Sequence, residues 1–274
     1  MAALRVNKKS LKRRYENMTR QLAELAAGTR SRPTPDEIHD LRVTVRRIQV
    51  LRKLLPNGSR TSEVSRRFGF TLKSALKSTS QLRDLDTLTE TLDSHKSYLP
   101  PELLVRLGNQ RSDAAARAKT AISVFTEVPA PDFEPTESGK KISRRLRKRV
   151  RSRDRTIARL LTDVLNDESK VEELHALRKE VKKMRYLLEL SDGGSARLLT
   201  LTKWQESLGA IHDLDVAVGY LEKSGFDSKR GAILNLLRAR RANYLRFVRD
   251  YRVSYMEGET RPVAGSPDPG VIGY

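Results

Sequence analysis

Cysteine is absent from this chain of 274 residues, which excludes disulfides, thiolate metal sites and cysteine nucleophiles. Aromatic residues make up only 5% of the sequence, so platforms for stacking nucleic-acid bases are scarce. No window reaches the ~18 uninterrupted apolar residues of a membrane span, and the basic segment from Met1 to Arg14 lacks the apolar run of a signal peptide. We therefore expect a soluble, cytoplasmic protein with no membrane partner.

Positive charge is what the chain has in excess. Lysine and arginine number 54 against 34 acidic residues, which gives a formal net charge of +20 and a pI near 10.4. Hydrophobic residues, at 38%, are numerous enough for a sizeable core and too numerous for a disordered chain. Because self-repulsion opposes a compact state, this charge predicts a polyanionic partner. By charge alone nucleic acid, a phosphate polymer and an anionic membrane surface all qualify, although we expect no membrane partner.

Apolar residues recur at helical spacing through nearly the whole chain, and no strand pattern is convincing, which predicts an all-α fold. An acidic, proline-rich segment at 127–138 is the clearest linker. We expect one domain over 1–256, built from a first helical repeat over 1–126 and a second over 139–256. The tail, 257–274, is expected to be flexible. Asp36 is expected to cap the helix that contains His39.

One basic helical motif occurs twice. The segment from Ile38 to Arg47 returns as the segment from Leu174 to Lys183, and each copy has a histidine, a cation three residues later and two cations seven and eight residues later. Positions i, i+3 and i+7 share one face of a helix. The two helices therefore predict one anion site lined by His39, Arg42, Arg46, Arg47, His175, Arg178, Lys182 and Lys183.

Each copy is followed by an Asp-Leu-Asp element, at Asp84–Asp86 and at Asp213–Asp215. The histidines lie 136 residues apart and the Asp-Leu-Asp elements 129 apart, which supports an internal duplication into two bundles about a pseudo-twofold axis. Arg83 stands where the second copy has His212, and this favours an electrostatic role for both over metal ligation. The aspartates are open to acid–base or metal roles, but pairing with a neighbouring arginine is the favoured interpretation.

Further cations complete the predicted anion contacts. The densest run of charge extends from Lys140 to Arg155. We predict phosphate contacts from the run's Arg144, Arg145 and Lys148, from the equivalent Arg13 and Arg14, and from the i, i+4 pair Lys73 and Lys77. Trp204, the single tryptophan, falls on a leucine stripe and is predicted to be a core residue.

These motifs resemble the CHAD family, the conserved-histidine α-helical domain, from about Leu11 to Tyr251. The resemblance rests on His39-x-x-Arg42-x-x-x-Arg46-Arg47, on Leu82 to Asp86, and on the second copies at His175 and at His212 to Asp215. It implies two four-helix bundles around a central basic cavity that binds inorganic polyphosphate, with localisation at polyphosphate granules. It implies no enzymatic activity and no cofactor.

Two other functions stay open at the level of sequence. A nucleic-acid-binding protein fits the charge, although neither a zinc motif nor a helix-turn-helix glycine is evident. A metal-dependent phosphohydrolase is suggested by the adjacent His39-Asp40 and His212-Asp213 pairs, but four histidines in the whole chain make a metal cluster hard to assemble.

Overall fold

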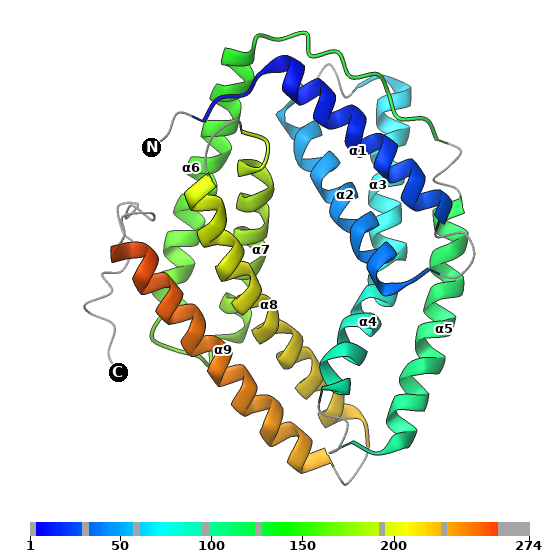
Figure 1. The fold of residues 1–274 in the computed structure, drawn as a ribbon, viewed down its shortest axis with the longest axis vertical. Coiled ribbons are helices and arrows are strands. Elements are labelled where there is room, and N and C mark those ends of the chain that lie inside the picture. Colours follow the sequence, from blue (N-terminus) through cyan, green and yellow to red (C-terminus); the bar gives the residue numbers. More distant parts are fainter. Residues whose placement is uncertain are drawn as a thin grey trace. The chain divides into compact units, whose positions relative to one another are not determined.

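The computed structural model describes residues 4–28, 33–56, 61–94, 99–123, 128–191, 195–225 and 229–256. Within these ranges it contains nine helical segments and no strand, which confirms the all-α prediction (Figure 1). In chain order they are α1 (Lys8–Gly28), α2 (Pro35–Leu54), α3 (Glu63–Ser78), α4 (Ser80–Asp93), α5 (Pro101–Ser123), α6 (Gly139–Val164), α7 (Val171–Leu188), α8 (Ser195–Lys223) and α9 (Arg230–Met256). Only Thr79 separates α3 from α4, so these two are parts of one interrupted helix. The predicted tail at 257–274 lies outside the described residues.

The chain divides into two compact units. The N-terminal unit comprises the described residues of 5–90 and 101–145, with α1, α2, α3, α5, most of α4 and the start of α6. The C-terminal unit comprises 146–256 with residues 4, 91–94 and 99–100, and contains the rest of α6 together with α7, α8 and α9. The predicted repeats, 1–126 and 139–256, stay a prediction.

In the N-terminal unit, α2 packs against α1 and α3, and α5 packs against α1 and α3. The helical spacing around His39 predicts an apolar stripe on α2 that reaches its C-cap, and the structure confirms it, because all members are buried: Ile38, Leu41, Val45, Ile48 and Leu55. On α5 the helical spacing predicts a buried stripe of Leu104, Leu107, Ala115, Ala118 and Ile122. Leu107, Ala118 and Ile122 are buried as predicted, whereas Leu104 and Ala115 are half-buried and their neighbours Leu103 and Ala114 are buried instead.

Thr34, and not Asp36, caps the N-terminus of α2. The Thr34 hydroxyl accepts a hydrogen bond from the Glu37 amide at 3.2 Å, and the Glu37 carboxylate accepts one from the Thr34 amide at 2.8 Å. This is a capping box with proline at the first helical position. The box fixes where the basic helix begins, one turn before His39.

The segment from Val128 to Ser138 is held against α1 by side chains. Tyr15 donates a hydrogen bond to the Pro131 carbonyl at 3.0 Å and stacks on Phe133, with ring centroids 4.8 Å apart. Lys12 forms an ion pair with Glu134. Both aromatic rings are buried, so this proline-rich segment contributes to the core of the N-terminal unit.

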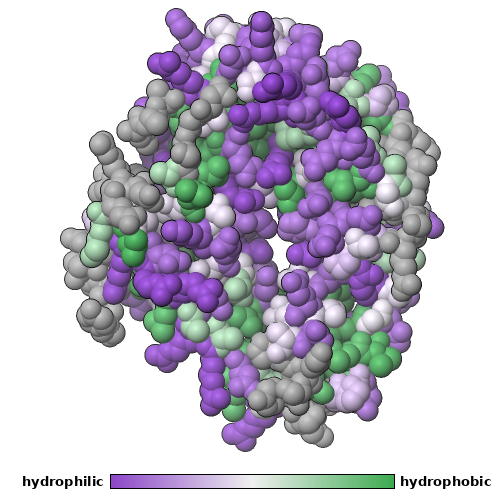
Figure 2. All heavy atoms as spheres, in the orientation of Figure 1, coloured by the Kyte–Doolittle hydropathy of each residue, from purple (hydrophilic) through white to green (hydrophobic). Residues whose placement is uncertain are grey.

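In the C-terminal unit, α8 packs on one side against α7 and on the other along α9 (Figure 1). Trp204 is buried and meets Phe247 edge-to-face at 6.0 Å, which confirms it as a core residue. The helical spacing around His175 likewise predicts an apolar stripe on α7, and it is buried throughout: Leu174, Leu177, Val181, Met184 and Leu188. Figure 2 shows hydrophilic residues over most of the visible surface outside these cores. Among the described helices, none combines the length and apolar character required to cross a membrane.

Candidate functional site

The predicted cationic stripe of α2 lies beside its buried apolar stripe. His39 is exposed, Arg46 and Arg47 are half-buried, and Arg42 is only 7% exposed. Nη1 of Arg42 donates to the Leu76 carbonyl at 2.7 Å and to the Thr79 hydroxyl at 2.8 Å. Arg42 therefore bonds α2 to the interruption between α3 and α4, in addition to any role with a ligand.

In the N-terminal unit, Arg46 and Arg83 lie close enough to Arg42 for their positive charges to repel that of Arg42. The pKa of Arg42 falls to about 10, first through burial and then through the charges of Arg46 and Arg83, while the carboxylate of Asp84 acts in the opposite direction. We call Arg42, Arg46 and Arg83 the N-terminal cationic cluster. Within the part of the chain that the structure describes, the side chains of Arg46 and Arg83 form no hydrogen bond or ion pair.

The C-terminal unit gathers its counterpart around two histidines. His175 of α7 and His212 of α8 are half-buried, their Nδ1 atoms lie 2.7 Å apart, and their ring centroids are 4.1 Å apart. Burial lowers the pKa of His175, as do Lys179 and Arg178. The pKa of His212 falls to about 4 through burial and the charges of Arg178, His175, Lys179 and Lys182.

We call Arg178, Lys179 and Lys182, together with the two histidines, the C-terminal cationic cluster. Arg178 lies 3.8 Å from the carboxylate of Asp213, and both side chains are partly exposed. Lys179 was not predicted as a site residue. It stands one turn after His175, so a helical wheel centred on the histidine could have identified it.

Lys183, also a predicted site residue, is engaged within the unit. Its ammonium group donates to Glu180 at 2.7 Å, and Glu180 also accepts from Arg153 of α6 at 2.5 Å. Arg145 is similarly engaged in the N-terminal unit, where it donates to the Leu54 carbonyl and forms an ion pair with Glu137. Lys183 is thus paired within α7, whereas Arg145 joins α6 to α2 and to the segment before α6.

The Asp-Leu-Asp elements hold each unit together, as their favoured interpretation predicted. Arg111 of α5 donates to Asp86 at 2.6 Å and to the Pro33 carbonyl at 3.2 Å. Arg240 of α9 likewise donates to Asp215 and, at 2.9 Å, to the Glu168 carbonyl. In both units the arginine stands 25 residues after the aspartate and ties it to the segment before the histidine helix. The sequence analysis missed both arginines, although their equal spacing was visible in it.

The remaining predicted residues lie on the surfaces of their helices. Arg14 is half-buried, and the others are exposed: Arg13, Lys73, Lys77, Arg144 and Lys148. Arg13 and Arg144 belong to the N-terminal unit with Lys73 and Lys77, whereas Lys148 belongs to the C-terminal unit. These residues stay candidate contacts whose convergence is a prediction.

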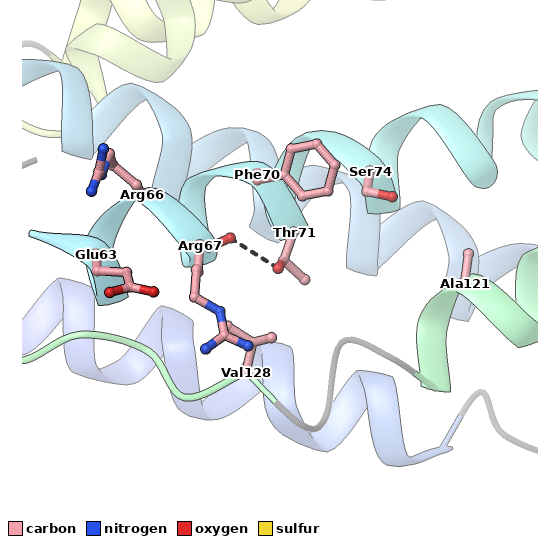
Figure 3. Close-up of a pocket in the computed structure, with 8 residues that line it drawn as sticks. All are labelled: Glu63, Arg66, Arg67, Phe70, Thr71, Ser74, Ala121 and Val128. Carbon is pink, nitrogen blue, oxygen red and sulfur yellow. Dashed lines mark hydrogen bonds between the residues drawn. The ribbon is translucent and has the colours of Figure 1, made fainter. Parts of the chain in front are cut away.

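A pocket of about 540 Å³ opens on α3 in the N-terminal unit (Figure 3). Its described lining includes Arg67 and Phe70 of α3, Ala121 of α5, and Val128, and contains none of the predicted site residues. Arg67 and Thr71 are joined there by a hydrogen bond from the Thr71 hydroxyl to the Arg67 carbonyl at 3.0 Å, internal to the helix. The described lining of the pocket thus shares no residue with the N-terminal cationic cluster.

Across the described ranges, no group of three or more histidine, aspartate or glutamate residues is arranged to hold a metal ion. His175 and His212 do not constitute such a site by themselves. Their Nδ1 atoms, 2.7 Å apart, are at hydrogen-bond distance, which is too close for a metal ion with ligand bonds of ~2.0–2.1 Å in tetrahedral geometry. The residues present give no support to the phosphohydrolase alternative.

Comparison with known proteins identifies the family and the fold of this chain. Residues 13–222 match the family model of the CHAD domain. Among solved structures, the chain resembles the CHAD domain from the plant Ricinus communis with a TM-score of 0.60 and 17% identity, over 96% of this chain and 95% of that one, which shows a shared fold. No curated protein matches the chain in sequence. On the extent of the family match, the chain belongs to the CHAD domain family.

Proposed function

We propose that this CHAD domain binds inorganic polyphosphate through its two cationic clusters and catalyses no reaction. The observation that supports this most directly is that Arg46 and Arg83, which come from two helices, lie close enough to Arg42 for their positive charges to lower its pKa. Gathering like charges opposes folding, so such groups mark candidate binding sites for an opposite charge.

The chemistry of the clusters suits a phosphate polymer. Arginine presents a planar fork of donors to phosphate oxygens, and lysine provides a movable point charge. Polyphosphate has a charge at every unit and no bases, so it requires cations and no stacking surface. With 5% aromatic residues, the chain offers cations far more readily than a stacking surface. Release of counterions from the polymer contributes to the driving force.

The finer architecture predicted from the sequence belongs to this proposal. It consists of an internal duplication, a pseudo-twofold axis and a central basic cavity lined by both repeats. The matched contacts of Arg111 with Asp86 and of Arg240 with Asp215 support the duplication. Localisation at polyphosphate granules is part of the same proposal, as a consequence of binding.

The absence of catalysis is supported by how the aspartates are used. Asp86 and Asp215 both accept hydrogen bonds from arginines, and Asp213 lies beside Arg178. A carboxylate held in this way serves to orient its arginine, and the side chain of Asp86, only 1% exposed, is out of reach of a substrate.

A titration with long-chain polyphosphate tests the proposal. The variant replaces Arg46, Arg83, Lys179 and Lys182 by glutamine, and it spares Arg42 because that side chain bonds α2 to Leu76 and Thr79. We expect affinity to fall roughly a hundredfold or more, with unchanged helicity. By analogy with single-stranded nucleic acid, the slope of log affinity against log salt should become shallower by about 3.

The matched control removes the same charge from exposed cations elsewhere, on α5 and α9: Arg106, Lys119, Arg230 and Arg241 to glutamine. This control should bind nearly as the natural chain does. Equal weakening of both variants would mean that net charge alone drives binding. Competition by single-stranded or duplex DNA at equal phosphate concentration would support the nucleic-acid alternative instead.

A further inference from the structure

Two imidazoles in direct contact form an unusual element of the C-terminal cationic cluster. The Nδ1 atoms of His175 and His212 lie 2.7 Å apart, so exactly one proton occupies the space between them. At the position that corresponds to His212 in the Asp-Leu-Asp element, the N-terminal unit has Arg83, a permanent cation. The pair therefore gives the C-terminal unit a titratable group where the N-terminal unit has a fixed charge.

The donors that this pair offers to a ligand depend on its protonation. When both rings are neutral, one ring donates from Nδ1 and has a bare Nε2, and the other accepts at Nδ1 and has a proton on Nε2. One Nε2 is then a donor and the other an acceptor. Uptake of one proton at the bare Nε2 makes both Nε2 atoms donors and leaves the bond between the Nδ1 atoms intact. An ionised phosphate oxygen accepts hydrogen bonds only, so it matches the protonated pair.

We propose that His175 and His212 act as one binding element that takes up a proton from solvent when the domain binds polyphosphate. This inference rests on the proposed function. It adds that binding to the C-terminal unit is coupled to protonation, so that affinity increases as pH falls.

The charged groups around the pair explain why the proton arrives with the ligand. From α7 the pair is faced by Glu172, Arg178, Lys179 and Lys182, and from α8 by Asp213 beside Arg178 and by Asp215, which Arg240 of α9 binds. Burial and then the α7 cations lower both histidine pKa values, while Glu172 and Asp215 partly offset this for His175. A bound polyanion supplies the missing negative charge and removes the repulsion that keeps the pair neutral.

Linkage fixes the sign of the effect. A group whose pKa is higher in the complex than in the free protein takes up protons on binding between those two pKa values. The free value for His212 is about 4. From the pKa of the complex down to that value, affinity should increase by up to ~tenfold for each unit by which the pH is lowered.

The test uses the full chain with His39 and His95 replaced by glutamine, which leaves the pair as the only histidines. Calorimetric titration with long-chain polyphosphate at pH 5.5, between the free value of about 4 and the ordinary histidine value of 6.5, in buffers of different ionisation enthalpy, counts the protons taken up. We expect an uptake approaching ~1 proton per chain. In parallel, nitrogen NMR of ¹⁵N-labelled histidine should show one protonated Nε2 in the free protein and two in the complex.

The matched variant adds His212→Arg, which supplies the fixed charge that Arg83 supplies in the N-terminal unit. We expect it to bind without proton uptake and with an affinity that does not change between pH 5 and 8. Tight binding of polyphosphate by the parent with no proton uptake, or uptake that persists in the His212→Arg variant, would overturn this inference alone. Failure of the natural chain to bind polyphosphate at any pH would overturn the proposed function and this inference with it.

Discussion

Arg111 and Asp86 form the same contact in the N-terminal unit that Arg240 and Asp215 form in the C-terminal unit. The Asp86 side chain is 1% exposed and that of Arg111 is 22% exposed, so the carboxylate depends on this partner. Because each arginine also donates to a carbonyl that precedes the histidine helix, the contact orients the helices that contain both cationic clusters.

Replacing Arg111 by methionine should reduce the free energy of unfolding by about 3 kcal/mol, because Asp86 would be left as an unpaired buried carboxylate. Chemical denaturation monitored by circular dichroism measures this loss. Adding Asp86→Asn should recover part of it. Arg117→Met is the control, since Arg117 donates to Gln81 on the surface, and it should change stability by less than ~0.5 kcal/mol. Equal effects of both single variants would contradict the structural role of Arg111.

Removing the hydroxyl of Tyr15 should cost about 1 kcal/mol, because the hydroxyl donates to the Pro131 carbonyl that holds the 128–138 segment on α1. Phe133→Ala should cost about 3 kcal/mol through loss of a buried ring. Tyr244→Phe is the matched variant, since Tyr244 donates to Val164 at 2.8 Å in the other unit. Proteolysis in the 128–138 segment should be faster in Phe133→Ala and unchanged in Tyr244→Phe. Equal rates of proteolysis in the Phe133→Ala and Tyr244→Phe variants would show that Phe133 does not hold the 128–138 segment on α1.

Gly139 and Gly108 should respond in opposite directions to alanine. A Cβ atom at Gly139 would lie 2.8 Å from the Val6 carbonyl oxygen, a backbone atom with little freedom to move, so Gly139→Ala should destabilise by about 1–3 kcal/mol. A Cβ atom at Gly108, inside α5, would meet nothing within 4 Å, so Gly108→Ala should stabilise by about 0.5–1 kcal/mol. Thermal unfolding of the two variants checks both signs. A stabilising Gly139→Ala would contradict the close approach of Val6 to α6.

Acid should destabilise the ligand-free protein in part through His212. Its pKa in the folded chain is about 4, below the ordinary 6.5, so the unfolded chain binds this proton more readily. The stabilising contribution is thus complete above pH 6.5 and is lost as pH falls toward 4. Unfolding midpoints measured from pH 8 to 4 should fall less steeply in His212→Gln than in the natural chain. Identical slopes would show that His212 keeps its ordinary proton affinity.

The fold was largely predictable because helical periodicity is local. The α2 stripe from Ile38 to Leu55 and the α7 stripe from Leu174 to Leu188 follow the period of the helix, and both are buried. The cap of α2 was also present in the sequence, because Thr34 precedes Glu37 by three residues, but Asp36 was preferred. On α5 two of the five predicted core positions, Leu104 and Ala115, differ by one residue from the buried Leu103 and Ala114, because neighbouring leucines and alanines give little contrast there.

The site was predictable only as a set of candidate residues. The spacing placed Arg42 on a cationic stripe, but its burial depends on how α2 packs against the Thr79 interruption, and helical spacing does not encode that contact. The contact between His175 and His212 likewise arises from the packing of α7 on α8, between residues 37 apart in the chain. Such pairings need the tertiary structure.

The central claim is that the two cationic clusters recognise a phosphate polymer. Its most direct test is a titration of long-chain polyphosphate, at physiological salt, into the natural chain, the glutamine variant at Arg46, Arg83, Lys179 and Lys182, and the charge-matched control on α5 and α9. We expect saturable binding to the natural chain and to the control, and an affinity for polyphosphate that is lower by roughly a hundredfold or more in the cluster variant. Equal affinities for all three proteins would contradict it.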